Sequence, residues 1–230
     1  MIPDIFMMTY NRPQMLSRTV QCLYDRTTTP FNLHIVDDGS YAGQIVLLGL
    51  WGDGKAKTIV MRETNRGVPY NIRLMATLTE SDPVILMGDD HLCPLVEPDW
   101  LTRGLMAMDE NLNMGMLALN DPSCNTNNRR HVKERAKPIT ICEFVGGTFL
   151  FIRREIIESF VYPKAWEAIQ SPLKSWANHT RELGYDVGYL VDTYCQHIGK
   201  FSARMGTDIS EHLIEPIDPV TLEPAEEYAW

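Results

Sequence analysis

Two stretches near the N-terminus, DIFMMTYNRP at residues 4–13 and LHIVDDGS at residues 33–40, carry most of the information about the fold. Each begins with a short apolar run typical of a buried strand, and each run ends in polar, turn-forming residues. Between the two stretches apolar residues recur at helical spacing, and Pro13 stands where a helix can begin. Together they predict a strand, a helix and a second strand.

The same alternation continues to about residue 100. Helix-like segments at 45–50 and 70–78 are followed by strand-like runs at 58–61 and 83–87, respectively. Alternating strands and helices favour a mainly parallel sheet with helices on both faces. The predicted fold class is therefore α/β, with a Rossmann-like, mostly parallel sheet flanked by helices.

The second half of the chain is less regular, and its strands and helices do not simply alternate. Ser171-Pro172 is a typical helix start and Gly184 a typical stop. The predicted elements are helices at 101–108 and 171–184, and strands at 114–119, 139–144, 149–152 and 187–191. No linker divides the chain, so we expect one domain at residues 1–205 and a tail at 206–230.

The charge of the chain is unevenly distributed. The formal net charge is −9, from 21 Lys and Arg against 30 Asp and Glu. Seven acidic and no basic residues follow Arg204, which leaves 21 basic and 23 acidic residues, a net charge of −2, on residues 1–205. The acidity therefore belongs largely to the tail, and the near-neutral body does not exclude an anionic partner.

The sequence predicts neither a membrane span nor a disulfide framework. No run approaches the ~18–20 consecutive apolar residues of a span, and the N-terminus lacks a basic-then-apolar signal pattern. The five cysteines are scattered and form no CxxC pair. Reduced thiols in a cytoplasm fit this usage, so we expect a cytoplasmic protein.

Polar residues follow three of the predicted strands. They are TYNR at 9–12, DDGS at 37–40 and GDDH at 88–91. In an open α/β sheet, ligands bind beyond the carboxyl ends of the strands. The coincidence of three such ends predicts a binding site at that edge.

The first two of these motifs, within residues 4–40, resemble the opening of family 2-like glycosyltransferases with the GT-A fold. Residues 65–67 (NRG) with Asn71 resemble the family's next segment. Residues 87–90 (MGDD) stand where those enzymes carry their Asp-rich, metal-binding strand end, and 146–148 (GGT) resemble their central Gly-Gly segment. Residues 183–185 (LGY) with 197–199 (HIG) resemble the closing elements of the family. The resemblance therefore covers roughly residues 4–199.

The resemblance implies metal-dependent transfer of a sugar from a nucleotide-diphosphate sugar, most simply a UDP-sugar. It makes residues 1–100 the nucleotide-sugar half and 101–205 the acceptor half. A divalent ion held by carboxylates can neutralise the charge that develops on a diphosphate leaving group, and hard oxygen ligands suit Mn²⁺ or Mg²⁺. Asp90 is then the metal ligand, and His197 contacts the metal or the diphosphate. The implied nucleotide-sugar residues are Thr9, Tyr10, Arg12, Asp38, Asn71, Asp89, Gly146 and Gly147.

Two departures from the family pattern concern the chemistry. Gly88 stands where many relatives carry the first of three acids, and residues 165–176 contain no Asp where inverting relatives place their base. Glu167 is the candidate base if the enzyme inverts, and inversion or retention of configuration stays open. His91 follows the acidic pair and could touch the metal, but a solvated side chain is the default expectation for it.

The basic segment around residues 129–137 has two interpretations. One is a solvated loop; the other is a groove for an anionic acceptor, which could be a phosphorylated sugar, a lipid phosphate or a nucleic acid. The candidate acceptor-binding residues are Arg129, Arg130, Lys133 and Arg135. Two alternative functions are a sugar-phosphate nucleotidyltransferase and a non-catalytic nucleotide-sugar binder.

Overall fold

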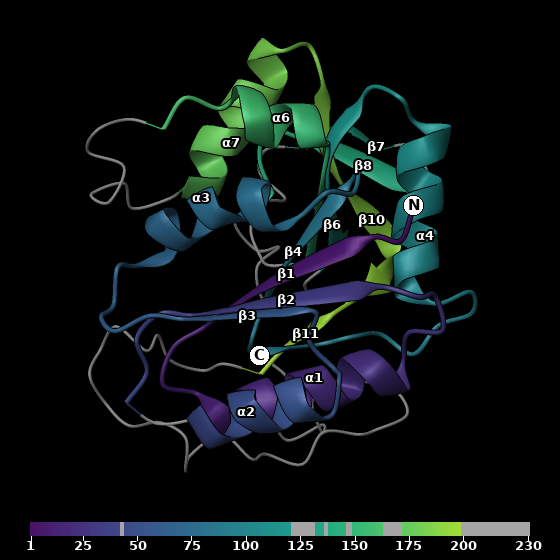
Figure 1. Ribbon diagram of the computed structural model, residues 1–230. Helices are drawn as coiled ribbons and strands as arrows, with labels where there is room; N and C mark the ends of the chain where they lie inside the picture. The colour runs from purple at the N-terminus through teal and green to yellow at the C-terminus, as the bar shows by residue number, and fades with distance from the viewer. Residues whose placement is uncertain (42–43, 121–131, 136–137, 146–148, 163–171, 199–230) are drawn as a thin grey trace.

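A central sheet of nine strands organises the computed structural model (Figure 1), in the order β3-β2-β1-β4-β9-β6-β10-β8-β7. The structure describes residues 1–41, 44–120, 132–135, 138–145, 149–162 and 172–198. In sheet order the strands are β3 Thr58–Met61, β2 Asn32–Asp37, β1 Asp4–Thr9, β4 Val84–Gly88, β9 Phe149–Ile152, β6 Met114–Asn120, β10 Asp186–Tyr194, β8 Ile139–Cys142 and β7 Val132–Arg135.

Most strands of the sheet run in one direction, as the sequence predicts, although four of its eight pairings are antiparallel. β1 pairs in parallel with β2 and β4, and β2 with β3. β9 runs antiparallel to both β4 and β6, while β10 is parallel to β6 and β8 is antiparallel to both β10 and β7. Seven of the nine strands therefore point the same way, and only β9 and β8 are reversed.

Helices cover both faces of the sheet. On one face lie α1 (Pro13–Asp25), α2 (Gln44–Gly52) and α4 (Trp100–Glu110); on the other lie α3 (Val68–Leu78), α6 (Arg154–Ser159) and α7 (Pro172–Glu182) (Figure 1). Along β1 the buried side chains alternate, because Ile5 and Met7 join the first core while Phe6 joins the second. This alternation produces two apolar cores, one on each side of the sheet.

The structure adds elements that the sequence patterns do not predict. β7 and α6 are two of them, and β7 falls inside the basic segment around residues 129–137. A separate two-stranded sheet joins β5 (His91–Leu92) to β11 (Gln196–His197) in antiparallel fashion. The tail at 206–230 and the domain boundary at 205 lie outside the described residues. Among the described helices, none has the length and apolar character needed to cross a bilayer.

Candidate active site

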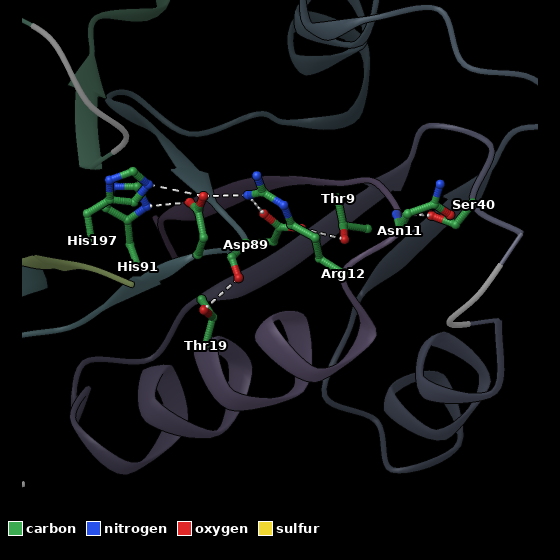
Figure 2. A network of polar contacts seen from close by, with 9 residues as sticks. Thr9, Asn11, Arg12, Thr19, Ser40, Asp89, His91 and His197 are labelled. Atoms are coloured by element: carbon green, nitrogen blue, oxygen red, sulfur yellow. Dashed lines mark hydrogen bonds and ion pairs between the residues drawn. The ribbon is translucent and has the colours of Figure 1, made fainter. Parts of the chain in front are cut away.

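A sharp turn between β1 and α1 positions the first side chains of the site. Asn11 adopts a φ of 53°, in the left-handed region that Asn tolerates better than most residues. Its backbone N–H donates to Ser40 Oγ at 2.8 Å, and its Oδ1 accepts from the Tyr41 N–H at 3.0 Å. Pro13 then begins α1. The turn leaves Arg12 directed toward the end of β4 (Figure 2).

Arg12 contacts both carboxylates of the acidic pair after β4. Its Nη1 lies 2.5 Å from Asp90 Oδ2 and 3.5 Å from Asp89 Oδ1. Asp89 Oδ2 also accepts from Thr9 Oγ1 at 2.7 Å, and the Asp89 carbonyl accepts from Thr19 Oγ1 at 2.8 Å (Figure 2). Asp89 is thus fixed by both β1 and α1.

The two buried carboxylates differ in acidity. Burial, and then repulsion from Asp90, raise the pKa of Asp89 to about 7, against the opposing effects of Arg12 and Thr9. Burial alone would raise the pKa of Asp90 as well. Hydrogen bonds with His197 and His91 outweigh that effect and hold the pKa of Asp90 well below its usual range. Asp90 is therefore the member of the pair that stays ionised near neutral pH.

Two histidines meet at Asp90. His197 lies opposite His91 in the β5–β11 pair, and their rings stack with centroids 4.5 Å apart. His91 Nδ1 is 2.8 Å from Asp90 Oδ1, and His197 Nε2 is 3.1 Å from Asp90 Oδ2. One ligand atom from each of the three residues lies within 4.8 Å of the other two, so that together they could hold a metal ion. We refer to Asp90, His91 and His197 as the Asp–His–His group.

The expectation of a solvated His91 is wrong. Its side chain is buried, with 2% relative exposure, because it packs between His197 and the edge of Phe149. The sequence shows that His91 follows the acidic pair, but it carries no local signal for the β5–β11 pairing that buries this side chain.

The two aspartates after β2 have different roles. Asp37 is structural, since its carboxylate accepts from both the backbone N–H and the hydroxyl of Ser40. The oxygens of Asp38 accept from the backbone N–H groups of Arg66 and Gly67 at 2.8 and 2.7 Å. Asp38 therefore holds the loop before α3 against the end of β2. Its implied role toward a nucleotide base stays a prediction.

A pocket of ≈ 170 Å³ lies where these segments converge. It brings together six residues that the sequence assigns to the nucleotide-sugar site: Thr9, Tyr10, Arg12, Asp38, Asn71 and Asp89. Met8, Asn65, Gly67 and Val68 complete its lining. Asn71 is oriented by Arg62, whose Nε donates to its Oδ1 at 2.8 Å. The pocket and the Asp–His–His group share the Arg12–Asp89–Asp90 contacts.

Of the remaining predicted site residues, the structure describes only Lys133 and Arg135, and both belong to a strand away from this cluster. Gly146, Gly147, Glu167, Arg129 and Arg130 lie outside the described residues. Lys133 and Arg135 belong to β7, the last strand of the sheet, five positions from β4. At a strand spacing of about 4.8 Å, about 24 Å of sheet separates β7 from β4, the strand that precedes the acidic pair.

Comparison with known proteins agrees with the family resemblance of the sequence. Residues 4–169, more than two thirds of the chain, match the model of glycosyl transferase family 2. The chain belongs to this family. A search of curated protein sequences gives no match.

Solved structures share the fold of this family 2 chain at low identity. GalNAc-T7 with UDP, GalNAc and Mn²⁺ has a TM-score of 0.68 at 13% identity, over 87% of this chain and 44% of that one. The mannosyltransferase PcManGT from Pyrobaculum calidifontis, in complex with GDP-Man and Mn²⁺, has a TM-score of 0.69 at 18% identity, over 88% and 59%. TarS 1-349 of S. aureus with UDP-GlcNAc has a TM-score of 0.61 at 15% identity, over 90% and 61%. The GT-A fold is thus shown, and the chain spans less than two thirds of each of these proteins.

Proposed function

We propose that the chain transfers a sugar from a nucleotide-diphosphate sugar to an acceptor, with a divalent cation held by the Asp–His–His group. The observation that carries this proposal is the position of the pocket. It opens at the carboxyl ends of β1 and β2, directly beside a carboxylate and two imidazoles in a family 2 chain. The relatives crystallised with UDP, UDP-GlcNAc or GDP-Man support a nucleotide sugar as donor.

The donor set of the Asp–His–His group fits a divalent ion. Asp90 supplies an ionised carboxylate, and His91 and His197 supply ring nitrogens held against it. Two imidazoles favour Mn²⁺ over Mg²⁺, since Mg²⁺ prefers oxygen ligands and water. The two relatives whose structures contain Mn²⁺ support the same choice. Once bound, such an ion neutralises the negative charge that develops on the leaving diphosphate.

The residues of the chain would do the rest by position and charge. Asp38, fixed by Arg66 and Gly67, would accept a hydrogen bond from the base, and Asn71 would contact the nucleoside beside it. Arg12 would present its guanidinium to the diphosphate. Asp89, held by Thr9 and Thr19, would contact the ribose or the sugar. Positioning and charge stabilisation of this kind supply large rate factors even without a general base.

Four finer points stay part of the proposal. Glu167 is our candidate base for an inverting reaction, and Gly146 and Gly147 would let the backbone approach the sugar. Arg129, Arg130, Lys133 and Arg135 would bind an anionic acceptor, which could be a nucleic acid. We also propose a cytoplasmic location, which the scattered cysteines without a CxxC pair support.

A donor screen tests the proposal directly. Melting of the protein would be followed with UDP-, GDP- and dTDP-sugars, each with Mn²⁺, and hydrolysis or transfer would be measured for any that bind. A donor at 100 times its Kd should stabilise the folded state by ~2.7 kcal/mol. Asp90→Ala should abolish the Mn²⁺-dependent activity while the exposed Asp109→Asn should not. Binding without turnover would instead favour a non-catalytic binder, and pyrophosphate release from a nucleoside triphosphate would favour a nucleotidyltransferase.

A further inference from the structure

Arg12 occupies a position that a cation at the Asp–His–His group would contest. Its Nη1 lies 2.5 Å from Asp90 Oδ2, the same oxygen that His197 Nε2 approaches at 3.1 Å. The Arg12 and Asp90 side chains are only 15% and 12% exposed. The pair is therefore poorly screened by solvent, and both its attraction and any repulsion from a third charge are strong.

A divalent cation ligated by Asp90 would face the guanidinium across one carboxylate. Arg12 already balances part of the negative charge of Asp89 and Asp90. An ion of charge +2 beside it adds a like charge to a mostly buried site, so the two cations cannot both be well bound to Asp90. Arg12 has another place to go, because it also lines the nucleotide pocket. There a diphosphate offers the oxygen pairs that a guanidinium binds in bidentate fashion.

We propose that Arg12 and the divalent cation compete for Asp90, and that the donor diphosphate lifts this competition by drawing Arg12 into the pocket. This inference rests on the proposed function, because it needs a diphosphate in the pocket and an ion at the Asp–His–His group. It makes the cation site weak in the nucleotide-free protein and strong in the donor complex. By linkage, the cation strengthens donor binding by the same factor.

Coupling alone does not identify Arg12, since a diphosphate can also ligate the ion itself. The distinctive consequence is found without nucleotide. Removing the guanidinium should then improve cation binding, although it deletes a contact within the site. A purely structural Arg12 predicts the opposite, because loss of its ion pair would loosen Asp90 and weaken the ion's ligand.

The experiment measures Mn²⁺ binding to the full chain by electron paramagnetic resonance of the free ion, without nucleotide and with saturating UDP or GDP. Arg12→Gln should bind Mn²⁺ at least tenfold more tightly than wild type in the absence of nucleotide. The factor by which the nucleotide improves Mn²⁺ binding should fall at least tenfold. Arg12→Met carries the same expectation and serves if Arg12→Gln does not fold, as judged by circular dichroism. Arg18→Gln, on α1, is the control with an equal change in charge and should match wild type.

The outcomes separate the inference from the proposed function. If Arg12→Gln and Arg12→Met bind Mn²⁺ no better than wild type without nucleotide, while Asp90→Asn abolishes nucleotide-dependent binding, the competition is refuted and the cation site stands. If wild type binds no Mn²⁺ with either UDP or GDP, the cation site itself is wrong and the inference falls with it.

Discussion

The two halves of the central sheet, β3-β2-β1-β4 and β9-β6-β10-β8-β7, position site residues in different ways. β3, β2, β1 and β4 are parallel neighbours, so that their carboxyl ends lie at one edge and deliver Thr9, Asp38 and Asp89 together. On the other side β9 and β8 are reversed, and sheet order departs from chain order. The segment that follows β10 in the chain contributes His197, through the pairing of β11 with β5 in the separate two-stranded sheet.

This difference shows where precision in the site comes from. In the parallel half, regular topology alone gathers the polar strand ends. In the mixed half, one contact between residues 107 positions apart, His197 with Asp90, completes the possible metal group. This comparison can be tested at three places. They are the boundary between the two halves, where Trp100 packs, the parallel half at Gly39, and the Asp–His–His group at His197.

The largest effect is expected at the seam. Trp100 is fully buried, and its ring centroid lies 5.0 Å from that of Phe149 and 6.0 Å from that of Phe151, both in β9. Its Nε1 donates a hydrogen bond to Thr27 Oγ1 at 2.8 Å. Trp100→Ala should lower the free energy of unfolding by about 3–5 kcal/mol. Urea denaturation measures it, and Trp51→Ala on the exposed side of α2 should change stability by less than about 0.5 kcal/mol.

The shape of the same transition is informative. Because Trp100 joins both halves, we expect a single cooperative transition in wild type and variant. Two separate transitions in the variant, one for each half, would show that the halves are independent units and would contradict the single domain.

A smaller effect is expected within the parallel half, at Gly39. It has a φ of +80°, and a Cβ there would lie 2.5 Å from the Thr64 carbonyl carbon and 2.8 Å from the Asn65 nitrogen. Gly39→Ala combines left-handed strain with a backbone clash, so it should cost about 2–4 kcal/mol. Gly54→Ala is the matched control: its φ is +68° with nothing within 4 Å, and strain alone should cost about 1–2 kcal/mol. Equal losses of thermal stability in Gly39→Ala and Gly54→Ala would mean that the backbone at Thr64 shifts at little cost to accommodate the added Cβ.

The parallel half was predictable from sequence because its signals are local. Apolar runs, turn residues and Pro13 fix β1, α1 and β2 within a residue or two, and parallel strands necessarily bring their ends to one edge. The left-handed Asn11 and the inward course of Arg12 were not predictable. They depend on Ser40, Tyr41 and Asp90, which lie 29 to 78 residues away.

The structure of the mixed half was harder to predict from sequence, because it too depends on contacts between residues that are far apart in the chain. β9 inserts between β4 and β6, although no local pattern in Phe149–Ile152 says which neighbours it takes. The site role of His197 follows only from the family resemblance, and no local pattern indicates the burial of His91, because that burial depends on β11. Non-local pairings are set by the whole packed structure, which periodicity does not report.

The contribution of the mixed half to the site is tested at His197. If the Asp–His–His group holds the cation, His197→Ala should lower Mn²⁺-dependent transfer by about 100-fold, equivalent to about 2.7 kcal/mol. Initial rates over a Mn²⁺ titration measure this, and raised Mn²⁺ should recover part of the loss. His179→Ala on α7, where the ring contacts Ser159, is the control and should stay near wild type. An unchanged rate for His197→Ala would mean that His197 does not help to hold the cation and that the site is built by the parallel half alone.

The smallest effect concerns Asp99, the N-cap of α4, which ties this helix to the loop after α1. Oδ1 accepts from the Leu101 and Thr102 N–H groups, and Oδ2 from the N–H and hydroxyl groups of Thr28 and Thr29. Burial raises the pKa of Asp99, but these hydrogen bonds outweigh it and leave the pKa below its usual value. Asp99→Ala should therefore cost about 1–2 kcal/mol at pH 7.

The sign of the pH dependence follows from that lowered pKa. Below pH 3.8 the unfolded chain takes up protons at Asp99 before the folded protein does, so the stabilisation is complete above this pH and is lost as pH falls through the folded pKa. Asp4, whose pKa is also lowered, shifts wild type and variant alike and cancels in their difference. Urea midpoints for both proteins between pH 7 and pH 2.5 should converge at the acid end. A difference that stays constant with pH would assign the effect of Asp99 to packing of α4 rather than to its charge.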